Sequence, residues 1–145
     1  VFYKQLTKHL GKTTANQLAA SYPNLANPKR GGYAGGAAEW ERLQLAISLH
    51  RDAAIESASW GMFQIMGFNF ASCGYKTVFE FSAALKVNAG NQLKAFLGFC
   101  SKSPALMKAM KAKDFTGMAR NYNGEDYGNY DVLMQKAYEK LEGKK

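Results

Sequence analysis

Cysteine, proline and long apolar runs are all scarce in this chain. It has two cysteines, Cys73 and Cys100, and three prolines among 145 residues. The cysteines form no CxxC pair and have no histidine close by in the sequence, which excludes the common zinc and redox motifs. We therefore expect two buried thiols, with a disulfide as the alternative, and no metal and no cofactor. No apolar run reaches the roughly 20 residues that a membrane helix needs, so we expect no stable membrane insertion.

Acidic side chains are also in short supply. Eleven Asp and Glu stand against nineteen Lys and Arg, which leaves a net charge of +8. Such a charge favours approach to polyanions, either nucleic acid or an anionic cell envelope, and the alternative is that it serves solubility alone. Because the basic residues are scattered along the chain and do not form a dense patch, the sequence argues against nucleic acid as the partner.

The apolar spacing is helical almost throughout, and 145 residues suit a single domain, 1–145. Residues 22–36 hold two prolines and four glycines, so we expect an exposed loop there. Only residues 61–66 resemble a strand. The sequence predicts a mainly α fold with room for one small β-hairpin. The expected helices cover 1–20 with a break at Gly11, Ala37 to about His50 with a short turn after Asp52, 77 onward, 93–100, 103–110, 114–123 and 130–141.

Three of these helices begin with capping signals. Thr77 and Glu80 have the order of a capping box. Ser103 precedes a proline at the first helical position, and Asp114 can accept a hydrogen bond from the next helix. These signals predict helix starts more precisely than the apolar spacing does.

The stretch AIESASWGMFQIMG, residues 54–67, carries more polar chemistry than packing needs. Glu56 lies beside Ile55 and Trp60, and apolar surroundings can keep a carboxyl group protonated as a proton donor. The alternative is a solvated or helix-capping glutamate. Gln64 lies among Met, Phe and Ile, so its amide either clamps a loop or binds a ligand.

Residues 120–130 hold three Tyr, three Asn and two Gly. Tyrosine rings stack on sugar C–H groups, and asparagine amides both donate to and accept from hydroxyls. This composition is typical of a sugar site, although a helix end with surface tyrosines is an equal alternative. The Gly-rich loop around Tyr33 is a weaker signal, since it lacks the strand-to-helix setting of a phosphate loop.

Taken together, these segments resemble the N-acetylmuramidase domain of phage endolysins and related bacterial proteins. The resemblance runs over essentially the whole chain, and its Gly-x-x-Gln-Ile core is similar to a motif of goose-type lysozymes and lytic transglycosylases. The segment Tyr122-Asn123-Gly124 is similar to a further motif of those enzymes. The matching residues are Val1-Phe2-Tyr3, Asn27-Pro28-Lys29, Gly31-Gly32-Tyr33, ESASWGMFQIMGFN at 56–69, QLKAF at 92–96, ARNYNG at 119–124 and Tyr130-Asp131.

The resemblance implies a lysozyme-like α fold and cleavage of the β-1,4 bond between N-acetylmuramic acid and N-acetylglucosamine in peptidoglycan. It implies substrate-binding roles for Gln64, Tyr122 and Asn123, to which we add Ser57, Trp60 and Tyr127 as neighbours in the same motifs. Glycoside hydrolysis needs a general acid. Glu56 is the only acid within a matched motif, so it is our catalytic candidate, with Glu125 and Asp126 as second choices.

In the resembled family the acid glutamate lies in a Glu-Ser-Gly-type motif before the matched region, so we expect this domain to be N-terminally incomplete. The first alternative is therefore a catalytically impaired, peptidoglycan-binding remnant of the same fold. We expect a monomer that binds glycan strands, is made in the cytoplasm of a bacterial host and acts at the periplasmic peptidoglycan. Binding to nucleic acid through the net charge is the remaining alternative.

Overall fold

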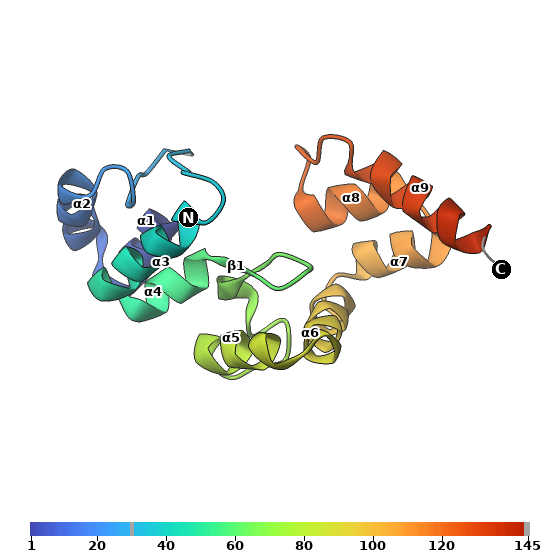
Figure 1. Ribbon diagram of the computed structural model, residues 1–145, viewed down its shortest axis with the longest axis horizontal. Coiled ribbons are helices and arrows are strands. Elements are labelled where there is room, and N and C mark those ends of the chain that lie inside the picture. Colours follow the sequence, from blue (N-terminus) through green and yellow to red (C-terminus); the bar gives the residue numbers. More distant parts are fainter. Residues whose placement is uncertain (30, 144–145) are drawn as a thin grey trace. The chain divides into compact units, whose positions relative to one another are not determined.

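The computed structural model describes residues 1–29 and 31–143, and within them the protein is mainly α (Figure 1). The short hairpin and the helices confirm the predicted class, a lysozyme-like α fold with one small β-hairpin. In chain order the elements are α1 (Phe2–Leu10), α2 (Lys12–Ser21), α3 (Ala38–Leu49), α4 (Arg51–Ser57), β1 (Ser59–Trp60), β2 (Ile65–Met66), the 3-10 helix η1 (Gly67–Asn69), α5 (Val78–Val87), α6 (Ala89–Ser101), α7 (Pro104–Ala112), α8 (Phe115–Asn123) and α9 (Tyr130–Glu142).

The chain divides into two compact units, residues 1–96 and residues 97–145, and each is described by itself. The first unit holds α1 to α5 and the first part of α6, and the second holds the rest of α6 and α7 to α9. The sequence-based assignment of one domain over residues 1–145 stays a prediction.

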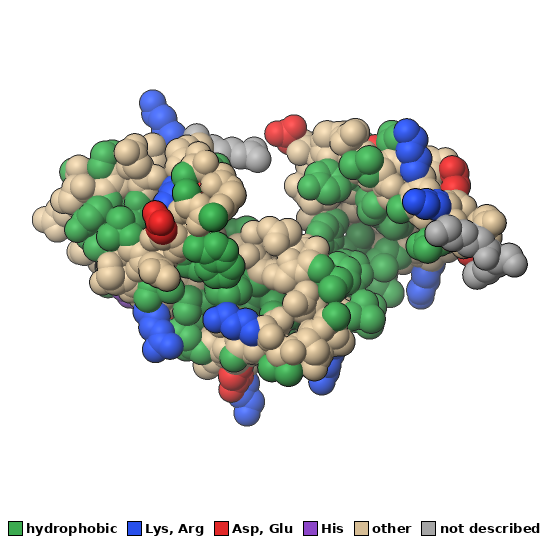
Figure 2. All heavy atoms as spheres, viewed as in Figure 1, with side chains coloured by type: hydrophobic (Ala, Val, Ile, Leu, Met, Phe, Trp, Pro, Cys, Tyr) green, Lys and Arg blue, Asp and Glu red, His purple; other side chains and the backbone are tan. Residues whose placement is uncertain are grey.

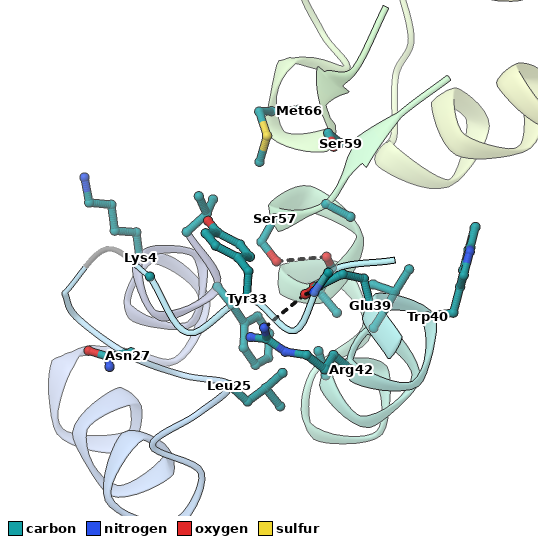
Figure 3. A pocket seen from close by; sticks show the side chains of 18 of the residues that line it. Lys4, Leu25, Asn27, Tyr33, Glu39, Trp40, Arg42, Ser57, Ser59 and Met66 are labelled. Carbon is teal, nitrogen blue, oxygen red and sulfur yellow. Dashed lines mark hydrogen bonds and ion pairs between the residues drawn. The ribbon is translucent and has the colours of Figure 1, made fainter. Parts of the chain in front are cut away.

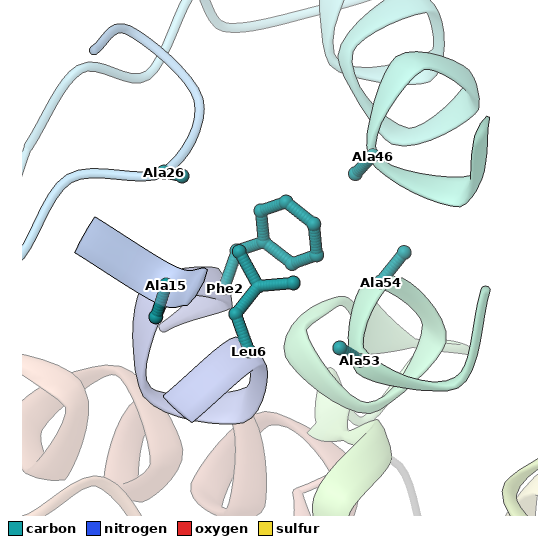
Figure 4. Packing of buried hydrophobic residues seen from close by; sticks show 7 residues of the cluster. All are labelled: Phe2, Leu6, Ala15, Ala26, Ala46, Ala53 and Ala54. Carbon is teal, nitrogen blue, oxygen red and sulfur yellow. The ribbon is translucent and has the colours of Figure 1, made fainter. Parts of the chain in front are cut away.

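One cluster of buried residues in the first unit is built from small side chains around two large ones. Helix α1 packs on α2 and on α4, and α3 packs on α4. Phe2 and Leu6 of α1 project into this core, where alanines from the surrounding segments let the backbones come close (Figure 4). The buried alanines are Ala15, Ala26, Ala46, Ala53 and Ala54.

The segment after α3 differs from the expected turn. The helix ends near His50 as predicted, but residues 51–57 form α4, so the short turn expected after Asp52 is wrong. The break falls at His50, whose backbone is extended and whose Nδ1 accepts a hydrogen bond from Ala53 N at 3.2 Å. A histidine ring acting as the N-cap was not anticipated, because the usual capping residues are Ser, Thr, Asp and Asn.

A two-stranded hairpin follows α4. Ser59 pairs with Met66 and Trp60 with Ile65, so the strand expected over 61–66 is correct only at its end, and residues 61–64 form the turn. Gly67 closes the hairpin against α4, because a Cβ at this position would lie 2.0 Å from Ile55 O. The same contact region includes a hydrogen bond from Gly67 N to Ala58 O at 2.8 Å.

The three predicted caps are all present. Thr77 Oγ1 accepts from Glu80 N at 3.1 Å, and Glu80 reaches back to Lys76 N at 2.9 Å. Ser103 Oγ accepts from Leu106 N at 3.3 Å, and Asp114 Oδ1 accepts from Gly117 N at 2.9 Å. Cys73 and Cys100 are free and buried, as expected.

The second unit has a thinner core. Helix α8 packs on α7 and on α9. The buried residues of these helices are Leu106 and Ala109 of α7 and Ala119 of α8. The part of α6 in this unit is only partly buried, since Cys100 is buried while Leu97 is 53% exposed. None of the helices in residues 1–29 and 31–143 is long and apolar enough to cross a membrane. Lysine and arginine side chains are spread over the face seen in Figure 2, which agrees with their scatter in the sequence.

Candidate functional site

A pocket of about 890 Å³ lies in the first unit (Figure 3). Its walls come from the start of α1, the loop of residues 22–36, one side of α3, the end of α4 and the hairpin. The polar and aromatic side chains among the lining residues are Phe2, Lys4, Asn27, Lys29, Tyr33, Glu39, Trp40, Arg42, Ser57, Ser59 and Gln64.

The hairpin wall presents an amide held in a fixed position. Gln64 Oε1 accepts from Ser59 Oγ at 2.7 Å, and Gln64 Nε2 donates to Gly61 O at 2.9 Å. A primary amide has two donors and two acceptor positions, so one of each is left for a ligand. Gln64 has a left-handed backbone, with φ at 51°, and is exposed. The structure therefore combines the two alternatives of the sequence, a loop clamp and an amide open to a ligand.

Ser57 lies on the pocket wall at the last residue of α4. Its hydroxyl donates to Ala54 O at 2.9 Å, one turn back along the helix. This bond sets the direction of the side chain and leaves the oxygen lone pairs as acceptors. The sequence-predicted pair of Ser57 and Gln64 is thus brought together at one pocket.

The loop of residues 22–36 is held by Glu39 and Arg42 of α3. Glu39 Oε1 accepts from Gly35 N at 2.9 Å and from Ala34 N at 2.6 Å, and Arg42 donates to Gly32 O and to Asn24 O. The hydrogen bond from Gly35, together with those from Ala34 and Arg42, keeps the pKa of the Glu39 carboxyl below its ordinary value, although burial acts in the opposite direction. Glu39 is therefore ionised at neutral pH and is not suited to donate a proton.

Two aromatic side chains on the pocket wall are open to solvent. Tyr33 is 67% exposed and Trp40 is 62% exposed. The Arg42 guanidinium lies 5.8 Å from the centre of the Tyr33 ring, which restrains the ring on the loop. Exposed rings beside hydroxyls and amides offer stacking faces to a saccharide.

Glu56, the catalytic candidate, is buried and is not among the pocket residues. Its Oε2 lies 3.0 Å from His9 Nε2 and 3.4 Å from Lys8 Nζ, both on α1. The carboxylate therefore links α4 to α1. His9 also lies near the His50 ring, with 5.0 Å between the ring centres.

Trp60 is likewise outside the pocket. Its ring is buried, its Nε1 donates to Ile55 O at 3.0 Å, and Lys86 Nζ lies 5.5 Å from the ring centre. These contacts fasten β1 to α4. The predicted substrate contact of Trp60 stays a prediction, and the pocket gives it no support.

Three predicted binding residues belong to the second unit. Tyr122 and Asn123 end α8, and Tyr127 lies in the turn before α9. The Tyr122 ring meets the Phe99 ring edge to face, with 5.6 Å between centres. Asn123 is exposed, and Tyr127 is half-buried. The Glu125 carboxylate lies 3.2 Å from Arg120 Nε, so this second-choice acid forms an ion pair.

Sequence reasoning missed the supporting pair of Glu39 and Arg42. The available signal was an acidic residue in the first turn of a helix that follows a Gly-rich loop, where backbone N–H groups need acceptors. Trp40 of α3 faces solvent, while Ala46 of the same helix is buried. No three His, Cys, Asp or Glu side chains of the described residues gather in a group that could hold a metal ion.

Two comparisons with known proteins found matches. The N-acetylmuramidase family matches residues 1–142. The crystal structure of the Burkholderia AP3 phage endolysin matches with a TM-score of 0.84 at 41% identity, covering 97% of this chain and 53% of that one. This chain thus spans about half the length of that endolysin. No curated protein matches significantly. With a family match over nearly its whole length, the chain belongs to the N-acetylmuramidase family.

Proposed function

We propose that this protein is a peptidoglycan hydrolase that cleaves the β-1,4 bond between N-acetylmuramic acid and N-acetylglucosamine. The proposal rests on the pocket that this member of the family contains. The walls of the pocket present the fixed amide of Gln64, the Ser57 hydroxyl and the exposed rings of Tyr33 and Trp40. Hydroxyl-rich, uncharged sugar rings are the ligands that this set of side chains suits best.

The remaining assignments follow from the same proposal. Both units act as one muramidase domain over residues 1–145, with Tyr122, Asn123 and Tyr127 as further glycan contacts. The protein acts as a monomer on glycan strands after synthesis in the cytoplasm of a bacterial host. The net charge of +8 assists its approach to an anionic envelope.

The sequence supports one role for Glu56, and its surroundings support another. The first is the catalytic role expected from the sequence, as general acid or as the residue that orients a water. The second is an ion-pair anchor between α4 and α1, supported by the contacts with His9 and Lys8. The conservative change Glu56→Gln separates them, because loss of the acid lowers kcat without unfolding, whereas loss of the anchor lowers stability first.

The competing function is a remnant that binds peptidoglycan without cleaving it. The pocket supports this alternative as well, because its carboxylate, Glu39, is engaged with the loop and Arg42. Purified peptidoglycan separates the two functions in one experiment. Sedimentation with the insoluble polymer measures binding, and release of soluble reducing sugars measures cleavage.

We expect both binding and release for the wild-type chain. Gln64→Leu should weaken binding, while Gln135→Leu on exposed α9 is the matched control and should leave it unchanged. Binding without release would support the remnant, and neither binding nor release would refute both functions.

A further inference from the structure

The backbone of the turn between β1 and β2 is hydrogen-bonded to a side chain of α6. Met62 N donates to Gln92 Oε1 at 2.8 Å, and Gln92 Nε2 donates to Leu85 O at 2.8 Å. A single amide on α6 thus joins the hairpin turn to the end of α5. All of these residues belong to the first unit.

The fit between Gln92 and the turn is close. Gly61 has φ at +69°, and a Cβ at this position would lie 3.0 Å from Gln92 Oε1. The glycine therefore supplies both the left-handed backbone and the space against which the amide packs. The stacked rings of Phe63 and Phe96, with 4.2 Å between centres, form a second tether between the turn and α6.

The hairpin needs such support because it is very short. Its strands contribute only two residue pairs, Ser59 with Met66 and Trp60 with Ile65. A two-stranded hairpin by itself is marginally stable in water. The conformation of residues 61–64 must therefore be fixed by contacts from outside the hairpin, and Gln92 makes the hydrogen bond to its backbone.

The hairpin turn also fixes the side-chain amide of Gln64, which lines the pocket. Gln64 Nε2 donates to Gly61 O, and Gln92 accepts from Met62 N, which is the N–H of the same peptide unit. We propose that Gln92 is a positioning residue: it holds the Gly61–Met62 backbone so that the Gln64 amide is presented to the glycan. The inference rests on the proposed function, since it assumes that the pocket of Gln64 binds peptidoglycan.

The neighbouring residue provides a matched control. Asn91 Nδ2 donates to Ala84 O at 3.0 Å, so Asn91 ties α6 to α5 as Gln92 does. Within the described residues it makes no hydrogen bond to the turn. Asn91→Leu thus removes a similar bond to α5 and leaves the tether to the hairpin in place.

Three variants test the proposal: Gln92→Leu, Gln92→Glu and Asn91→Leu. Two quantities are measured on the full chain, hydrogen exchange at the Met62 amide and the steady-state constants on purified peptidoglycan. Gln92→Leu removes the acceptor of Met62, so its amide should exchange at least about tenfold faster and KM should rise about fivefold, the effect of losing one hydrogen bond. Because Gln92 acts on binding, kcat should change by less than about twofold.

Gln92→Glu keeps an acceptor for Met62 N and loses the donor to Leu85 O. It should restore both the slow Met62 exchange and the wild-type KM, although the fold is less stable. Asn91→Leu should leave exchange and KM unchanged. An unchanged KM in Gln92→Leu despite fast Met62 exchange, or an equal rise of KM in Asn91→Leu, would overturn the positioning role.

The Met62 exchange also separates this inference from the proposed function. A wild-type chain that neither binds nor cleaves peptidoglycan refutes the proposed function and the positioning role with it, whatever the exchange shows. A wild-type chain that is active, with Gln92→Leu normal in KM, refutes the positioning role alone.

Discussion

Replacing His9 by alanine should destabilise the first unit more than replacing Glu56 by glutamine. The Glu56 side chain is only 6% exposed, and His9 Nε2 lies 3.0 Å from its Oε2. Removing His9 leaves the carboxylate buried with one remaining partner, Lys8, whose side chain is 62% exposed. Removing the charge of Glu56 itself leaves an amide of nearly the same shape.

The expected magnitudes follow from burial. Removing a hydrogen-bond partner of a buried group costs about 1–3 kcal/mol, and we expect a loss in this range for His9→Ala because Lys8 remains beside the carboxylate. Glu56→Gln should cost about 1 kcal/mol, and Lys8→Ala less than about 1 kcal/mol because it breaks an exposed contact. The double variant His9→Ala with Glu56→Gln should be less destabilised than the sum, with a coupling of about 1–2 kcal/mol.

Urea unfolding of the four variants and the wild type measures these terms at pH 7, and peptidoglycan cleavage is measured on the same samples. At about 2–4 °C per kcal/mol for a chain of this size, the differences are also visible in Tm. Additive effects of His9→Ala and Glu56→Gln would refute the ion-pair anchor. A Glu56→Gln variant with wild-type stability and a kcat lowered by orders of magnitude would establish the catalytic role instead.

Three further predictions concern single positions. Gly67→Ala should unfold the hairpin end or the whole first unit, because the added Cβ would lie 2.0 Å from Ile55 O. Circular dichroism melts should show a large loss of Tm, and an unchanged Tm would contradict the close packing. Asp114→Ala removes the N-cap of α8 and should cost about 1 kcal/mol in urea unfolding, and an unchanged free energy of unfolding would contradict the cap. Glu39 has a lowered pKa, so its stabilisation of the loop is present above its ordinary pKa and is lost as the pH falls through the lowered value. Glu39→Gln should therefore speed exchange at the Gly35 amide at pH 7 but not in strong acid, and an equal effect at both pH values would exclude the ionised carboxylate as the cause.

The helices were predictable because their signals are local. Thr77, Ser103 and Asp114 cap the helices that follow them, and Gly11 breaks the first helical segment with a φ of 81°. Each of these signals depends on side chains within a few residues of the backbone groups they satisfy. The start of α4 directly after His50 was not predicted, because a histidine ring seldom serves as an N-cap.

The site was harder to predict because its geometry depends on distant residues. Ser57 and Gln64 were predicted as substrate-binding residues from their motif, and both line the pocket. The burial of Glu56 depends on His9 and Lys8, which precede it by more than forty residues, and no local pattern reveals that contact. Gln92 reaches the hairpin from thirty residues away, so its role was equally invisible in the sequence.

The central proposal is most directly tested by the new ends that cleavage creates in purified peptidoglycan. After digestion and borohydride reduction, mass spectrometry identifies which sugar carries the reducing end. We predict reduced N-acetylmuramic acid at the new ends of wild-type digests, and its absence when the protein is heat-denatured. Reduced N-acetylglucosamine, or intact glycan strands after prolonged incubation with folded protein, would contradict the proposed muramidase activity.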